Sequence, residues 1–219
     1  AEHMQAEPPE MMQSFLDAAP ELGEMGKYFT SCFGPFDFKS VTQKLPDTLI
    51  DDETTIKVGD KDVHLIPVGP AHTPGDTLAY VPADRTVYTG DILFIGGHPI
   101  IWEGPVQNWI NACDRIIDMD VETIVPGHGP ITTKAGVEEV RHYMVTMRNE
   151  ARARYEAGMN YKEAAFDIAL GVFDDWGDRE RIVINCATMF HEFGAQGKPE
   201  ITELFTAMAE YAAAFPQKD

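Results

Sequence analysis

The chain has little cysteine, little positive charge and no long apolar run. Its three cysteines are odd in number and far apart in the sequence, which argues against a disulfide framework and against Cys-x-x-Cys metal or redox motifs. These free thiols are Cys32, Cys113 and Cys186. The 17 Lys and Arg residues face 36 Asp and Glu residues, a net charge of -19. Such a charge repels a phosphate backbone, so we expect no nucleic-acid partner.

The absence of an apolar stretch of 18 or more residues argues against a membrane-spanning helix. The first ten residues, "AEHMQAEPPE", also lack the basic and apolar regions of a secretory signal. We therefore expect no membrane partner, and a cytoplasmic location is the default.

What is present is enough apolar content for one sizeable core. Hydrophobic residues make up 44% of the 219 residues, and this length favours a single domain over residues 1–219. Apolar and polar residues alternate on both sides of Gly59-Asp60, the pattern of a β-hairpin, whereas residues 106–119 and the chain from Lys134 onward keep a helical period. The sequence therefore predicts an α/β or α+β layered fold. Its expected parts are a helical cover or lid (1–33), a sheet region (34–135) and a helical tail (136–219).

Three loops in the sheet region each place one good metal ligand after an apolar strand. They are "GPAHTPGD" with His72, "YTGDILF" with Asp91 and "VPGHGP" with His128. One such histidine alone is more often a surface or core residue, and a strand-end Gly-Asp is often only a turn. Three in this order favour a metal site, because open layered sheets place ligands at strand ends. Imidazole and carboxylate groups suit Zn²⁺, Fe and Mn²⁺ without cysteine.

The motifs "AHTPGD", "TGDILF" and "PGHGP" resemble the later ligand loops of the metallo-β-lactamase superfamily. This family of αββα hydrolases includes glyoxalase II-like thioesterases and flavodiiron-type proteins. The resemblance covers about residues 40–135, and it implies a four-layer αββα sandwich. It also implies that His72 binds the first metal, that His128 binds the second, and that Asp91 is the catalytic residue bridging the two.

The chain departs from the family in one motif. The His-x-His-x-Asp-His loop, which supplies further ligands to both metals in family members, is absent. His3 has no second histidine nearby and cannot replace it, and His64 lies on an alternating strand, where a packing or surface role is the simpler interpretation. We expect the chain to be a fragment that lacks the first strands and helix of the sandwich, with a natural variant as the alternative. An intact member would hold two zinc ions; here we expect one or none, with Fe or Mn as alternatives, and weak or no turnover.

The function implied by the resemblance is metal-dependent hydrolysis of an ester, thioester or amide in a small-molecule substrate. Asp91 stands where β-lactamases of the superfamily usually carry Cys or Ser, so the resemblance favours a glyoxalase II-like enzyme. The alternatives are an iron-dependent oxidoreductase, sulfur dioxygenase-like or flavodiiron-like, and a non-catalytic remnant.

Two further expectations concern the surface of the protein. Ile95, His98 and Trp102 follow Asp91 closely and are candidates for the substrate pocket, although a surface position is the simpler interpretation of His98. A sandwich without its first strands would expose apolar strand faces, so association into homo-oligomers is also expected.

Overall fold

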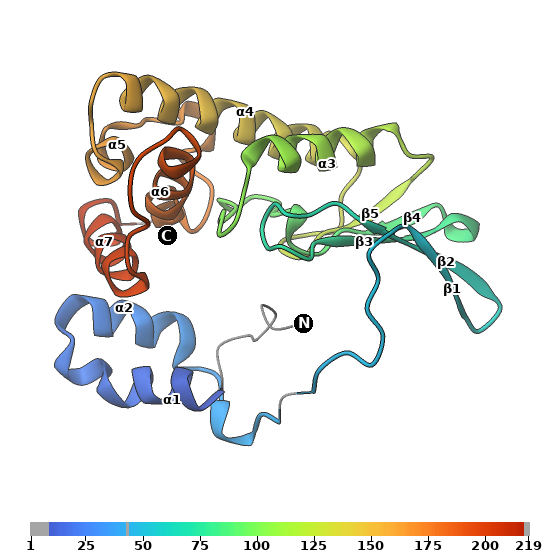
Figure 1. Ribbon diagram of the computed structural model, residues 1–219, viewed down its shortest axis with the longest axis horizontal. Coiled ribbons are helices and arrows are strands. Elements are labelled where there is room, and N and C mark those ends of the chain that lie inside the picture. Colours follow the sequence, from blue (N-terminus) through green and yellow to red (C-terminus); the bar gives the residue numbers. More distant parts are fainter. Residues whose placement is uncertain (1–8, 43, 217–219) are drawn as a thin grey trace. The chain divides into compact units, whose positions relative to one another are not determined.

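The computed structural model describes residues 9–42 and 44–216, which contain seven α-helices and five β-strands (Figure 1). They form two compact units. The first combines the chain up to Leu49 with Glu200–Phe215, and the second contains Ile50–Pro199. The predicted mixture of helices and strands is confirmed. The single domain over residues 1–219 stays a prediction.

The first unit is helical. Its helices are α1 (Pro9–Ala18), α2 (Gly23–Phe33) and α7 (Ile201–Ala214). Pro20 lies in a 3-10 turn that separates α1 from α2, because proline lacks the N–H that a continuous helix requires. Phe29 is buried at the centre of this unit, and its ring centroid lies 4.7 to 5.7 Å from those of Phe15, Phe33 and Phe205.

The predicted lid falls within this first unit. Of residues 1–33, the first eight lie outside the described residues, and the remainder form α1, α2 and the turn between them. A covering role for these helices stays a prediction.

The second unit contains one five-stranded sheet with the order β1-β2-β3-β4-β5. Its strands are β1 (Thr54–Val58), β2 (Lys61–Pro67), β3 (Thr77–Val81), β4 (Thr86–Tyr88) and β5 (Thr123–Val125). The first four strands pair antiparallel as a meander, with Val58 opposite Lys61 across the predicted Gly59-Asp60 turn. β5 pairs parallel with β4.

One face of the sheet forms the core of the second unit. Side chains on this face come into register across the strands, with Ile66 opposite Leu78 and Val87 opposite Ile124. All four are buried, as is an apolar stripe along the helix between β4 and β5. This is the alternation expected of a sheet covered on one side.

Four helices complete the second unit: α3 (Val106–Asp118), α4 (Lys134–Glu156), α5 (Tyr161–Asp167) and α6 (Ile182–Glu192). Within this unit α3 and α4 lie on the same side of the sheet (Figure 1). The described residues hold no second sheet, so they show a sheet layer and a helix layer of the sandwich. The predicted helical C-terminal region is confirmed. Within the described ranges, every helix is too short or too polar to span a lipid bilayer.

Candidate metal centre

Strand direction brings the three ligand loops to one end of the sheet. β2 and β4 both run antiparallel to β3, and β5 runs parallel to β4, so β2, β4 and β5 point the same way. His72 follows β2, Asp91 follows β4 and His128 follows β5. The three side chains therefore gather at the carboxyl ends of these strands.

Asp91 lies between the two histidines. Its Oδ2 is 3.3 Å from Nε2 of His72, and its Oδ1 is 3.3 Å from Nε2 of His128. Each imidazole thus faces a different oxygen of one carboxylate. The structure brings together all three residues that the sequence singled out.

Two glycines shape the backbone around Asp91. Gly90 has a φ of +51°, a conformation that other residues rarely adopt. Gly127 packs directly under the carboxylate: a Cβ at this position would lie 2.3 Å from Oδ1 of Asp91. The N–H of Gly127 also donates to the Gly90 carbonyl at 2.9 Å. The loops after β4 and β5 therefore meet without side chains between them.

His72 is buried and oriented through its second ring nitrogen. Its Nδ1–H donates to the Ile100 carbonyl over 2.8 Å, which leaves Nε2 facing Asp91. The ring also lies edge-on to Trp109 and close to Phe94. A histidine that ligates a metal through one nitrogen commonly donates from the other to a carbonyl, because this fixes the tautomer and the ring plane.

His128 is held by stacking, and about half of its side chain is exposed. Its ring lies parallel to that of Phe94, with the ring centroids 4.3 Å apart. Its carbonyl accepts from the Ile95 N–H at 3.0 Å, and its own N–H donates to the Leu93 carbonyl at 3.3 Å. The loop after β5 thereby continues a parallel pairing beside the loop after β4.

The imidazoles and the carboxylate of the site stabilise one another's charged forms. When the His72 ring is protonated on both nitrogens, the hydrogen bond from its Nε2–H lowers the pKa of Asp91 and outweighs burial, which raises it; His128 and Arg181 lower it further. Burial lowers the pKa of His72, but the hydrogen bonds to Asp91 and to the Ile100 carbonyl raise it more, so the net shift is upward. Asp91 is thus held as a carboxylate, the form that binds a cation.

This donor set fits divalent metal, although not as a cage around one ion. Two imidazoles and a carboxylate are ligands that Zn²⁺ and Fe²⁺ accept. Within residues 9–42 and 44–216, however, no group of three or more His, Cys, Asp or Glu side chains could hold a metal ion. Each imidazole instead faces its own oxygen of the Asp91 carboxylate, an arrangement that suits two separate cations better than one. His3 lies outside the described residues, and His64 packs against Tyr80 on the sheet.

The three pocket candidates lie in different surroundings. Ile95 and Trp102 are partly exposed, whereas His98 is fully buried, so the expected surface position of His98 is wrong. Its Nε2–H donates to the Phe173 carbonyl at 2.9 Å, and its Nδ1 lies 3.0 Å from the Tyr143 hydroxyl. Desolvation lowers the pKa of His98 to about 4. The pocket role of these three residues stays a prediction.

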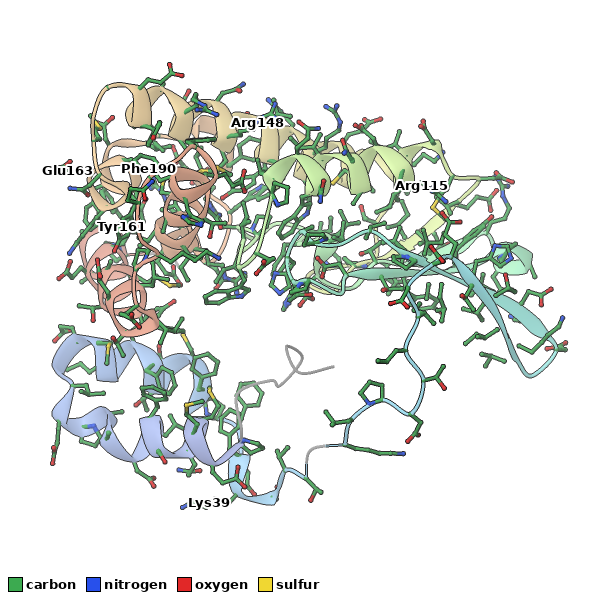
Figure 2. All side chains as sticks on the ribbon, viewed as in Figure 1. Lys39, Arg115, Arg148, Tyr161, Glu163 and Phe190 are labelled. Carbon is green, nitrogen blue, oxygen red and sulfur yellow. The ribbon has the colours of Figure 1, made fainter. Side chains whose placement is uncertain are left out.

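A hollow of about 340 Å³ lies beside α3, between the end of β2 and residues such as Asn108, Asn111 and Arg115. Arg115 lies near the carboxyl end of α3 (Figure 2). His72, Asp91 and His128 do not line the hollow, so it belongs to a different part of the surface.

Sequence reasoning missed the groups that support the ligands. No pattern in the sequence marks the Ile100 carbonyl as the acceptor for His72. Asn185 can be recognised in the sequence, because it is a lone amide in the apolar run "RIVINCATMF", and the structure shows that it is fully buried. A buried amide needs hydrogen-bond partners, so its presence there indicates a polar contact that α6 makes inside the core.

Comparisons with known proteins relate the sequence and the fold of this chain to one superfamily. A family model of the metallo-beta-lactamase superfamily matches residues 9–128, more than half of the chain. Over 74 residues the chain is 31% identical to the alpha subunit of 2,4-dinitroanisole O-demethylase from Nocardioides sp. (strain JS1661). That match covers 33% of this chain and 23% of the relative, so the chain spans about a quarter of the curated relative.

Two solved structures share the fold at low sequence identity. One is the stereoselective inverting sec-alkylsulfatase Pisa1 from Pseudomonas sp., with a TM-score of 0.54 and 15% identity over 80% of this chain and 32% of that one. The other is a metallo-beta-lactamase family protein from Thermus thermophilus, with a TM-score of 0.52 and 17% identity over 74% of this chain and 53% of that one. With the family match, the fold and the three ligand loops all in agreement, the chain belongs to the metallo-beta-lactamase superfamily.

Proposed function

We propose that this chain contributes His72, Asp91 and His128 to the metal site of a hydrolase that cleaves an ester, thioester or amide bond in a small molecule. The observation that carries the proposal is the placement of one carboxylate between two imidazoles, each at 3.3 Å from its own oxygen. A carboxylate in this position can be shared between two cations. The presence of zinc, a pair of ions and a glyoxalase II-like specificity all belong to this proposal.

When bound, a divalent cation supplies Lewis-acid polarisation of a substrate carbonyl and lowers the pKa of a water molecule. The residues of this chain would hold and orient the cations. Buried His72 offers Nε2 with its ring plane fixed, and Asp91 offers an ionised carboxylate on a backbone braced by Gly127. His128 offers Nε2 from a side chain that is about half exposed.

The names of the similar proteins suggest which substrates to try first. The demethylase subunit acts within an enzyme for 2,4-dinitroanisole, and the structural neighbour is a sec-alkylsulfatase. A screening panel should therefore add an aryl methyl ether and a secondary alkyl sulfate to aryl esters, thioesters and anilides.

Zinc binding tests the proposal directly. The full chain, stripped of metal with a chelator, is titrated with Zn²⁺ against a chromophoric chelator, and metal content after reconstitution with Zn²⁺ or Fe²⁺ is measured by mass spectrometry. We expect Asp91→Ala, His72→Ala and His128→Ala each to weaken binding by about tenfold or more, as loss of a ligand should exceed the loss of a supporting group.

His64→Ala is the matched control, because His64 lies on β2 and contacts Tyr80 rather than Asp91. It should bind zinc as the unaltered chain does. Equal zinc affinity in all four variants would show that the three loops hold no metal and would overturn the proposal.

A further inference from the structure

The Ile100 carbonyl accepts the hydrogen bond from His72, and the backbone around it is in turn hydrogen-bonded by side chains of α6 and of the turn before it. Three side chains on one stripe of this helix region contact the backbone of residues 98–101. Arg181 donates to the His98 carbonyl at 2.9 Å, and Thr188 donates to the Ile101 carbonyl at 2.6 Å. Their spacing of three and four residues around Asn185 places all three on the same helical face.

Asn185 contacts both neighbours of Ile100. Its Oδ1 accepts the Ile101 N–H at 2.8 Å, and its Nδ2 donates to the Pro99 carbonyl at 2.9 Å. The same Nδ2 donates to the Tyr143 hydroxyl at 3.2 Å. Because the Asn185 side chain hydrogen-bonds to the backbone of both Pro99 and Ile101, it restrains the direction of the Ile100 carbonyl between them.

The Ile100 carbonyl is the hydrogen-bond partner of the His72 ring on the side away from Asp91. It accepts from Nδ1 at 2.8 Å, a shorter contact than the 3.3 Å between Nε2 and Asp91. A ring that keeps its proton on Nδ1 offers the lone pair of Nε2 to a cation. If the carbonyl turned away, the proton would gain by moving to Nε2, where it can bond to the Asp91 carboxylate and block the ligand atom.

We propose that Asn185 is a positioning residue for His72: by clamping the peptides on both sides of Ile100, it holds His72 in the tautomer that leaves Nε2 open. The proposal deepens the proposed function and rests on it only for the metal. A buried asparagine could also serve stability alone, so the test must report on His72 itself.

The first measurement needs no metal. The ring nitrogens of His72 are followed by long-range ¹H–¹⁵N NMR on the metal-free full chain at alkaline pH, where the ring is neutral, with His72→Gln used to assign the signal. In the unaltered chain we expect the Nδ1–H tautomer to dominate. In Asn185→Leu, which removes all three hydrogen bonds, and in Asn185→Asp, which keeps only an acceptor, we expect the Nε2–H tautomer to grow.

The second measurement is zinc affinity by chelator competition, where both variants should bind about 10- to 100-fold more weakly, as removal of supporting groups does elsewhere. Asn160→Ala is the matched control. It removes another hydrogen-bonded asparagine of the same unit, the N-cap of α5, and should change neither readout. Thermal unfolding identifies any variant that fails to fold; if Asn185→Leu does, Asn185→Asp carries the test.

The outcomes separate the two proposals. A tautomer shift without zinc binding in any form supports the role of Asn185 and contradicts the metal site. An unchanged tautomer in a folded Asn185 variant overturns the positioning role, as does zinc binding that is equally tight in that variant and in the unaltered chain.

Discussion

The ring of Phe94 lies parallel to the ring of His128, with an angle of 11° between their planes. Phe94 is buried, and its other neighbours are His72 at 5.9 Å and the Arg181 guanidinium at 5.3 Å. One apolar side chain therefore contacts both histidines of the candidate site. Phe94 belongs to the same loop as Asp91, so one short segment of backbone carries both the carboxylate and the ring that packs against the two histidines.

Replacing Phe94 with leucine should separate packing from ligand placement. The substitution keeps an apolar group but removes the flat surface against His128, so we expect zinc affinity to fall while the free energy of unfolding drops by less than about 1.5 kcal/mol. Chelator competition and urea unfolding measure the two effects. Phe190→Leu on α6, buried against Tyr155, should cost similar stability and leave zinc binding unchanged. Equal zinc affinity in both variants would remove Phe94 from the site.

Gly127→Ala tests the close approach under Asp91. The added Cβ would meet Oδ1 of Asp91 at 2.3 Å and the Gly90 backbone at 2.7 Å, so the carboxylate must move. We expect zinc affinity to fall by about tenfold or more. Gly75→Ala in the His72 loop meets no atom within 4 Å and serves as the control. A chain with Gly127→Ala that binds zinc normally would contradict the described position of Asp91.

His98 should make the protein less stable in mild acid. Its pKa is about 4 in the folded chain against 6.5 for an ordinary histidine, so below pH 6.5 the unfolded state takes up a proton that the folded state does not. Stability is therefore full above pH 6.5 and declines toward pH 4, with a loss of about 2 kcal/mol at pH 5. Urea unfolding at pH 7 and pH 5 measures this change.

A His98→Phe variant supplies the comparison for that pH dependence. It removes the titrating group from the core, so its own loss of stability between pH 7 and pH 5 should be smaller by about the same 2 kcal/mol. The partly exposed His64 is the reference, since His64→Gln should keep the full dependence. If the slope survives in His98→Phe, another group causes it.

Gly26→Ala should disturb the first unit alone. Gly26 packs against the turn before α2, where a Cβ would lie 1.8 Å from the Ala19 carbonyl oxygen. We expect faster hydrogen exchange in α1, α2 and α7, with unchanged exchange in α4 and α6 and unchanged zinc affinity. Hydrogen-exchange mass spectrometry resolves these segments. Faster exchange in α6 would show that the two compact units unfold together.

Much of the second unit could be read from local patterns. The hairpin around Gly59-Asp60 follows from period-two alternation, and α3 and α4 follow from their apolar stripes. The three ligand loops stand out because glycine and proline flank each histidine, and a glycine precedes the aspartate, where an apolar strand ends. Such signals lie within a few residues of one another in the sequence, so they can be recognised before the fold is known.

Short motifs and hydrophobic periodicity are enough to indicate the family, the mixed α/β class and the three ligand candidates. Three-dimensional packing was needed to show that Asp91 offers one oxygen to each histidine, that His98 is buried rather than exposed, and that Asn185 holds the peptide beside Ile100. These contacts join residues that lie far apart in the chain, 75 positions for His98 and Phe173 and 84 for Ile101 and Asn185. Hydrogen bonds across such separations depend on how α6 packs against the loop after β4, and no local pattern encodes that packing.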